Sequence, residues 1–134
     1  MAAKYDLKEV HRLVKEFLEG DPEKVFLSLP RASTQYVIRV YKVTPQEAEQ
    51  LILDGLLLLD KEDFCRTIWH TEWQVPMDEY GLEGYRDNNW YIKFFIADEG
   101  DDRFLSEVSF HPVEKELHLS DGRTLKVTYE PEDG

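Results

Sequence analysis

The sequence predicts an α+β fold in which N-terminal helices pack on a C-terminal antiparallel β-sheet. Two observations support this fold class. Up to residue 59, the clearest apolar patterns have the helical period and are bounded by helix-capping signals. From residue 60 to 129, β-branched and aromatic residues gather in short segments, and the links between these segments are too short for crossover helices. The 134 residues, 42% of them hydrophobic, fit a single domain with its own core.

The first helix is predicted near the N-terminus and ends before Gly20. Its apolar residues fall on one face at the helical period: Leu7, Val10, Leu13, Val14, Phe17 and Leu18. Asp6 and Glu9 have the spacing of a capping pair, so they can accept hydrogen bonds from the first free amides. Residues 21–30 then predict a turn with a short extended piece at Val25–Leu27, bounded by prolines.

The next segment, Arg31 to Val43, is ambiguous. Its β-branched and aromatic residues favour a strand, but the segment lacks clean alternation of apolar and polar positions. The signal that follows is stronger, because Thr44, Pro45 and Glu47 provide a hydroxyl N-cap, a proline in the first turn and a capping glutamate. We expect a helix from there to about Gly55, with a buried face made by Ala48, Leu51 and Ile52.

The remaining segments predict an antiparallel sheet with short connections. Strands are expected at Phe64–Trp69, Trp73–Val75, Trp90–Ala97, Phe104–Phe110, Leu117–Leu119 and Leu125–Tyr129. An Asp-Gly pair at Asp121-Gly122 predicts a hairpin turn between the last two, giving a C-terminal hairpin over Glu116–Tyr129. Residues 81–89 and 98–102 are expected to be exposed loops, and residues 130–134 an acidic tail.

Composition narrows the possible functions. The formal net charge of -12 opposes non-specific attraction to polyanions, so a nucleic-acid role would need a local cationic pocket. Cys65 is the only cysteine, and no stretch is apolar enough to cross a bilayer, which leads us to expect a cytoplasmic protein that does not act at a membrane. The glycine-rich phosphate and dinucleotide loops and the HExxH zinc motif do not occur. His70-Thr71-Glu72 matches half of a deaminase zinc signature, but its cysteine half is missing.

The order of short motifs between Tyr5 and Pro112 resembles that of the motility quorum-sensing regulator (MqsR) toxins, which are RelE-like ribonucleases that cleave messenger RNA. The chain carries Leu7, Val10, Leu13 and Val14 in the first helix of that pattern, then Arg31-Ala32-Ser33 and the capped helix from Thr44 to Leu53. The most specific match is Asp63-Phe64-Cys65-Arg66-Thr67-Ile68, followed by Trp73-Gln74, Tyr91-Ile92-Lys93 and Ser109-Phe110-His111. The resemblance implies that the ambiguous Arg31 to Val43 segment is helical, because tertiary context can override propensity.

The resemblance also implies a metal-independent endoribonuclease, an mRNA interferase, that belongs to a toxin-antitoxin system and would have single-stranded RNA and a cognate antitoxin protein as partners. Several departures from the family pattern bear on that expectation. Cys65 and Arg66 stand where the family has tyrosine and lysine, and His111 replaces a lysine at a strand end. The chain is acidic where the toxins are usually basic, and the Glu116–Tyr129 hairpin is an addition.

Cleavage of this kind needs no metal or other cofactor. It requires an acid, a base and cations for the charge that develops when a ribose 2′-hydroxyl attacks the adjacent phosphate. The resemblance implies that Arg66 clamps the phosphate with paired donors and that His111 transfers a proton, since histidine changes charge near neutral pH. Tyr91 would hydrogen-bond the phosphate or the leaving oxygen, and Gln74 would position the nucleotide. Lys93 lies two residues from Tyr91 on the same face of a strand and would add positive potential for RNA binding.

Each of these residues also has a structural interpretation. Arg66 can pair with a cross-strand carboxylate, His111 can end a strand before Pro112, and Tyr91 can be a packing aromatic. Trp69 and Trp73 can form a base-stacking platform for RNA or a buried aromatic pair. The alternative function is a non-catalytic acidic module on the same fold that binds a protein partner or mimics a nucleic acid.

Overall fold

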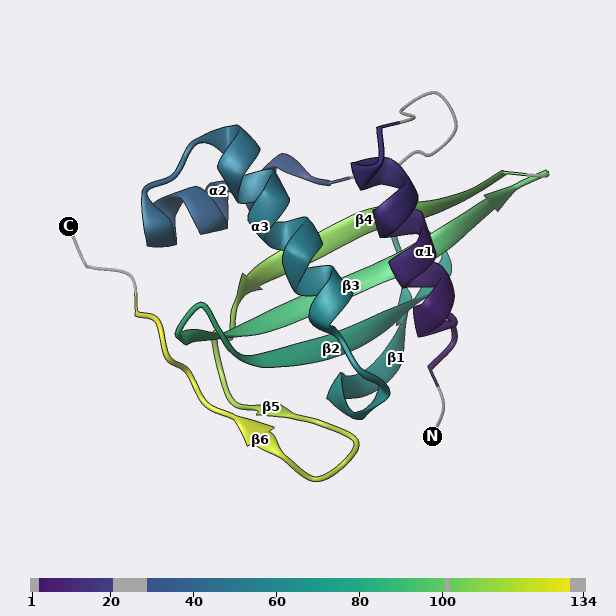
Figure 1. The fold of residues 1–134 in the computed structure, drawn as a ribbon. Coiled ribbons are helices and arrows are strands. Elements are labelled where there is room, and N and C mark those ends of the chain that lie inside the picture. Colours follow the sequence, from purple (N-terminus) through teal and green to yellow (C-terminus); the bar gives the residue numbers. More distant parts are fainter. Residues whose placement is uncertain (1–2, 21–28, 101, 131–134) are drawn as a thin grey trace.

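Helices pack against an antiparallel sheet in the computed structural model (Figure 1). The structure describes residues 3–20, 29–100 and 102–130. The helices are α1 (Leu7–Leu18), α2 (Arg31–Tyr41), α3 (Pro45–Leu58) and the short 3₁₀ helix η1 (Lys61–Asp63). The strands are β1 (Phe64–His70), β2 (Val75–Tyr85), β3 (Asn88–Glu99), β4 (Asp102–Pro112), β5 (Leu117–His118) and β6 (Thr124–Leu125). The predicted α+β arrangement, with helices before the sheet and a C-terminal hairpin, is therefore confirmed. No helix among the described residues is both long and apolar enough to span a bilayer.

The α1 helix forms where its apolar period predicts it, and the adjoining chain is tied to the sheet. The Asp6 carboxylate accepts a hydrogen bond from the Lys8 amide at the helix start. Just before it, the backbone amides of Lys4 and Tyr5 donate to the fully buried Asp78 carboxylate of β2 at 3.0 and 2.8 Å. Burying a carboxylate is costly unless it is hydrogen-bonded, so this pairing explains how Asp78 is accommodated. The extended piece predicted at 25–27 lies outside the described residues.

The ambiguous segment is the helix α2, in spite of its β-branched residues. Its contacts with the sheet explain this result. The Ser33 hydroxyl donates to the Val108 carbonyl at 2.8 Å and accepts from the Phe110 amide at 3.1 Å, so it bridges the helix to β4. Val37, one turn later, is fully buried in the same core. These contacts are formed by a helix and outweigh the small propensity differences among residue types.

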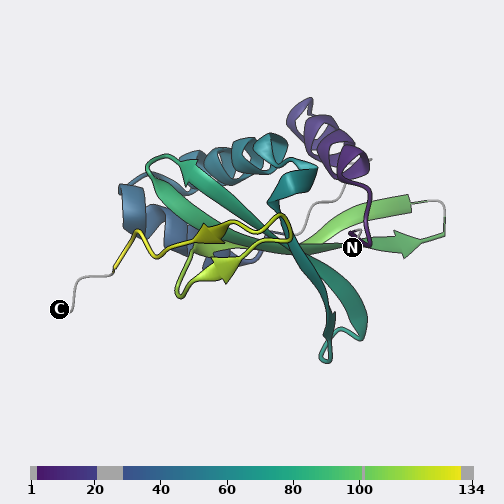
Figure 2. The same ribbon diagram turned by 90° about the horizontal axis from the view of Figure 1, so that it is seen from below.

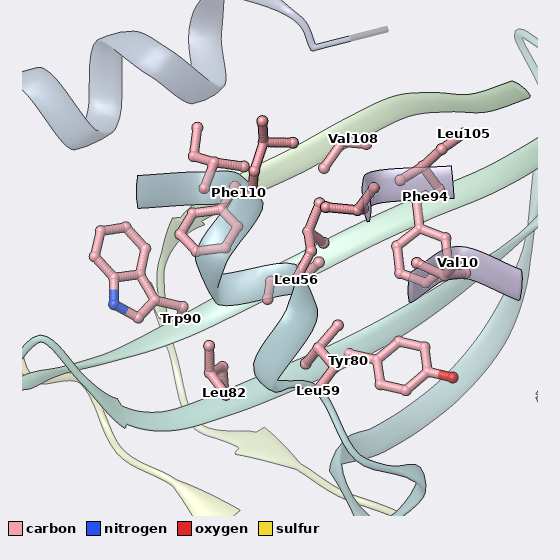
Figure 3. Packing of buried hydrophobic residues seen from close by; sticks show 14 of the residues in the cluster. Val10, Leu56, Leu59, Tyr80, Leu82, Trp90, Phe94, Leu105, Val108 and Phe110 are labelled. Carbon is pink, nitrogen blue, oxygen red and sulfur yellow. The ribbon is translucent and has the colours of Figure 1, made fainter. Parts of the chain in front are cut away.

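The α3 helix begins at the predicted capping box and runs one turn further than predicted. Thr44 and Glu47 exchange both hydrogen bonds of the box at 3.1 Å. Gly55 lies inside the helix and does not end it. A Cβ at this position would lie 2.9 Å from the Phe110 ring, so glycine allows α3 to approach the sheet closely. Figure 3 shows Leu56 and Leu59 at this contact, together with the sheet residues that they cover, Tyr80, Leu82, Trp90 and Phe110.

The main sheet is a meander in which β1, β2, β3 and β4 lie side by side in chain order, all antiparallel. The loop predicted for residues 81–89 is wrong. Strand β2 continues to Tyr85 and β3 starts at Asn88, so the turn is only Arg86-Asp87, whose φ angles are 53° and 68°. The strand predicted at Trp73–Val75 is also wrong at its start, because residues 71–74 form a turn closed by a hydrogen bond from the Gln74 amide to the His70 carbonyl. The loop predicted at 98–102 is shorter, since β3 reaches Glu99 and β4 starts at Asp102.

The predicted C-terminal hairpin exists and lies on the face of the sheet opposite α1 and α3 (Figure 2). Its second strand is shorter than predicted, because only Thr124–Leu125 pairs with β5. Leu119 and Leu125 pack with Val113 in a second, smaller apolar cluster. Gly81 makes this packing possible, since a Cβ there would lie 2.7 Å from a Leu125 methyl group. Arg123 ties the hairpin to η1 through hydrogen bonds to the Asp63 carboxylate at 2.9 Å and the Glu62 carbonyl at 3.0 Å.

Candidate active site

Four of the residues that the sequence singles out line one cleft on the sheet face that carries the hairpin. These are Arg66 on β1, Tyr91 and Lys93 on β3, and His111 on β4. Strand register brings them together, because Arg66 lies opposite Glu79, Glu79 opposite Lys93, and Tyr91 opposite His111. The cleft has a volume of about 640 Å³, and residues 113–116, which connect β4 to β5, form its other wall together with Leu117 of β5.

Glu79 on β2 is the centre of this arrangement. Its Oε1 accepts a hydrogen bond from Arg66 Nε at 2.6 Å, and its Oε2 accepts one from the Tyr91 hydroxyl. The Glu79 side chain is only 5% exposed, whereas that of Arg66 is 65% exposed. The carboxylate therefore holds the inner end of the guanidinium at the floor of the cleft. The outer Nη groups of Arg66 make no hydrogen bond to any residue in the described ranges, so they are available to an anion.

The same cluster shifts the pKa values of both partners of Glu79. The hydrogen bond to Glu79, and then its charge, raise the pKa of Arg66, so the guanidinium stays charged at every accessible pH. Burial raises the pKa of the Tyr91 hydroxyl well above its usual range, and the hydrogen bond to Glu79 adds to the shift. Tyr91 is thus a neutral hydrogen-bonding group near pH 7 and does not supply a phenolate.

His111 contacts two tyrosine rings. The Tyr91 ring stacks on it with centroids 4.9 Å apart, and the Tyr36 ring of α2 lies 5.3 Å away on a tilted plane. His111 Nδ1 lies 2.8 Å from the carbonyl oxygen of Pro112. Because a carbonyl can only accept, we assign the proton of the neutral ring to Nδ1. The other nitrogen, Nε2, then carries the free lone pair of a base.

The charges of the cleft balance. Its cationic side chains are Arg66, Lys93 and Lys115, and its carboxylates are Glu79, Glu114 and Glu116. Of the three cations, Arg66 is committed to Glu79, while Lys93 and Lys115 form no ion pair with a described residue. Glu114 lies at the rim with its side chain 66% exposed. Positive potential is therefore confined to the outer end of Arg66 and to the two lysines.

The structure does not bring Trp73 and Gln74 into the cleft. Both lie in the turn between β1 and β2, and Gln74 takes a left-handed backbone with φ of 54°. Trp69 pairs with Pro76, so it shares strand parity with Thr67, whose hydroxyl bonds Asp78 on the helix-bearing face. Trp69 therefore faces away from the cleft. Trp69 and Trp73 are 62% and 49% exposed, so the buried aromatic pair is excluded.

Cys65 lies beside the cluster and packs against the hairpin. Its Sγ donates to the His118 carbonyl at 3.1 Å, and burial, followed by the nearby Glu79 charge, raises the pKa of the thiol. A thiol that is protonated at neutral pH is a poor nucleophile. Cys65 is thus a packing residue in this structure.

Glu79 is the site residue that sequence reasoning missed. Glu79 belongs to no recognisable sequence motif. Its role becomes visible only in the strand register, which places it opposite Arg66 and Lys93. Within the described residues, no group of three or more His, Cys, Asp or Glu side chains is placed to hold a metal ion. Comparison of the chain with protein-family models, with curated proteins and with solved structures finds no match.

Proposed function

We propose that the protein is a metal-independent endoribonuclease that cleaves single-stranded RNA in the cleft on the hairpin side of the sheet. One observation carries the proposal: Arg66, Tyr91, Lys93 and His111 come from three different strands and line one cleft around a buried carboxylate. Such a cleft holds the proton-transfer group and the cations that attack of a 2′-hydroxyl on phosphorus requires.

In the proposed reaction, His111 is the base. Its Nε2 takes the proton of the ribose 2′-hydroxyl, and the 2′-oxygen forms a bond to phosphorus as the bond to the 5′-oxygen breaks. The products are a 2′,3′-cyclic phosphate and a 5′-hydroxyl. The leaving 5′-oxygen departs opposite the attacking oxygen, and the Lys93 ammonium is the group that supplies its proton.

The remaining residues bind the phosphate, stabilise the transition state or orient the groups that do so. The outer nitrogens of Arg66 bind two phosphate oxygens, and this contact strengthens as charge builds up in the transition state. Glu79 is a positioning residue, because it touches Arg66 and Tyr91 and is covered by them. Tyr91 supports the flat side of the His111 ring and so fixes the direction of Nε2.

The test is cleavage of a mixed-sequence single-stranded RNA by purified protein in the presence of EDTA. Alanine substitution of His111 removes the base, and we expect a loss of rate of about 100-fold or more. Arg66→Ala removes the phosphate clamp and should cost about 100-fold to 1,000-fold. End-group analysis should show 2′,3′-cyclic phosphates.

Two controls are matched to these variants. Arg12→Ala removes an exposed arginine that is also paired with glutamates, but on α1 at the other face of the sheet. His118→Ala removes an exposed histidine from the hairpin. Both controls should keep the wild-type rate. Equal residual activity in all four variants would identify a contaminating nuclease and sink the proposal.

A second function is favoured by charge. The net charge of -12 and the balanced cleft both weaken capture of a polyanion, which fits a non-catalytic module that binds a basic protein partner. The two functions separate in the same assay. A folded protein that neither binds nor cleaves RNA would favour the binding module.

The order of motifs adds a biological expectation. If the resemblance to MqsR toxins reflects common descent, the protein is the toxin of a toxin-antitoxin pair, acts on messenger RNA in the cytoplasm and is neutralised by a cognate antitoxin. Growth arrest on expression of the wild-type chain, relieved by His111→Ala, would support that role.

A further inference from the structure

A second cavity lies next to the proposed cleavage cleft. It has a volume of about 340 Å³ and is bounded by α2, by the end of β4 and by the chain that follows the hairpin. Tyr36, Arg39, Val127 and Tyr129 belong to its lining. It shares two wall residues, Val113 and Glu114, with the cleavage cleft, so the two hollows lie on either side of one short segment.

The lining of this cavity has flat apolar surfaces with hydrogen-bonding groups at the edges. Two tyrosine rings and Pro112 give the apolar surfaces. The Arg39 guanidinium lies over the Tyr36 ring at 5.6 Å, where it can donate, while the carboxylates of Glu114 and Glu130 can accept. Two carboxylates against one arginine make the cavity unsuitable for a phosphate. A planar heterocycle with both donors and acceptors, such as a nucleobase, matches it.

His111 connects the cavity to the cleft. Its ring contacts both Tyr91, which lines the cleft, and Tyr36, which lines the second cavity. The contacts that start at Arg66 and pass through Glu79, Tyr91 and His111 thus continue to Tyr36 in the second cavity. In an RNA strand each phosphate has a base on both of its sides, so a cavity beside a phosphate site is the position that one of these bases would occupy.

We propose that the cavity between Tyr36 and Tyr129, called here the base pocket, binds one nucleobase of the RNA next to the phosphate that is cleaved. The inference rests on the proposed function for its choice of ligand. It adds that the base pocket supplies affinity for RNA that an acidic protein otherwise lacks. Stacking on aromatic rings does not depend on net charge, so it compensates for the weak phosphate attraction.

The test uses binding, so it does not require cleavage. The probes are short 2′-O-methyl oligonucleotides, which cannot be cleaved, with a single A, C, G or U among abasic positions, and a fully abasic oligonucleotide as reference. We expect at least one single-base probe to bind the wild-type protein about ten-fold more tightly than the reference. In Tyr129→Leu that advantage should fall to about two-fold or less, while affinity for the reference stays unchanged.

Tyr129→Phe is the matched control, because it keeps the ring and should keep most of the advantage. Tyr36→Leu provides an independent second variant, and thermal melts show that each variant is folded. Equal affinity of all probes for the wild-type protein overturns the base pocket even if RNA is cleaved. A base preference that survives both leucine variants overturns its location. A base preference in a protein that does not cleave RNA supports the pocket and counts against the nuclease.

Discussion

Tyr91 packs on the sheet face through its ring and hydrogen-bonds the buried Glu79 carboxylate of the cleft through its hydroxyl. Its hydroxyl is shielded from water and donates to Glu79, and burial first and this hydrogen bond second raise its pKa above the usual 10. In the unfolded chain the hydroxyl ionises near pH 10. The folded protein keeps the proton to higher pH, so the contribution of Tyr91 to the free energy of unfolding is complete below pH 10 and is lost as pH rises above it.

We therefore expect Tyr91→Phe to change the alkaline limb of stability. Above pH 10 the wild-type protein should lose up to about 1.4 kcal/mol of unfolding free energy per pH unit through this group, and the variant should not. Urea unfolding curves of both proteins from neutral pH to pH 11 measure the difference. The other tyrosines are common to both proteins and cancel. Parallel pH profiles would contradict the assignment of Tyr91 as a buried, Glu79-bonded group.

The residues of the site could be predicted from sequence only in part. Arg66, Tyr91, Lys93 and His111 stand in motifs whose order is informative, and all four line the cleft. Glu79 stands in no motif, since its role is created by a cross-strand partner that one sequence does not reveal. Trp73-Gln74 stands in the motif order as well, but the chain turns at residues 71–74 and carries the pair away from the cleft.

At the scale of elements, the turn between β2 and β3 is the place where substitutions are most expected to increase the stability of the fold. Both of its residues, Arg86 and Asp87, have positive φ, which suits a two-residue hairpin but strains side chains with a Cβ. Replacing them by Arg86→Asn and Asp87→Gly gives the preferred sequence for this turn. The Arg86 carbonyl, which accepts from the Tyr41 hydroxyl at 2.5 Å, is retained because it belongs to the backbone.

We expect the double variant to gain about 1 kcal/mol in unfolding free energy, seen as a higher melting temperature in a thermal scan. The matched control is Asp121→Asn, which acts at the other hairpin next to Gly122 and should not stabilise, because Asp121 accepts two hydrogen bonds from Arg123. A loss of stability in the double variant would mean that the Arg86 side chain contributes more through its position over the Tyr85 ring than the turn costs.

This turn also explains which elements the sequence predicts and which it hides. The α3 helix and the last hairpin have local signals, a capping box and an Asp-Gly turn, and both form where those signals lie. The β2–β3 turn has no Asn-Gly or Asp-Gly pair, so the sequence predicts a loop over residues 81–89. The α2 helix is set by its contacts through Ser33 and Val37, which no local pattern encodes. Local capping and turn signals can therefore be recognised in a single sequence, whereas contacts between distant segments cannot.

At the scale of the whole molecule, the net negative charge opposes the binding of RNA that the proposed activity requires. The chain has 28 acidic and 16 basic residues, and its cleft has no net excess of either sign. A nucleic-acid-binding protein with a basic surface loses affinity as salt rises, by a log–log slope of about −0.7 per phosphate contact for single strands. Three cations would thus give a slope of about −2 if they acted alone. Here the acidic body adds a repulsion that salt relieves.

We therefore expect kcat/KM for RNA cleavage to be flat, or to rise, as KCl increases from about 10 to about 100 mM, because the screening length falls from about 30 to about 10 Å over that range. Distant carboxylates lose their influence first, while Arg66 acts in direct contact with the phosphate and is screened less. Glu116→Gln removes one carboxylate from the cleft wall and is the matched probe, since it should raise the rate at low salt and make the slope more negative. A wild-type slope near −2 would show that the cleft cations act without opposition from the acidic body, and would contradict the view that base stacking, more than charge, holds RNA on this protein.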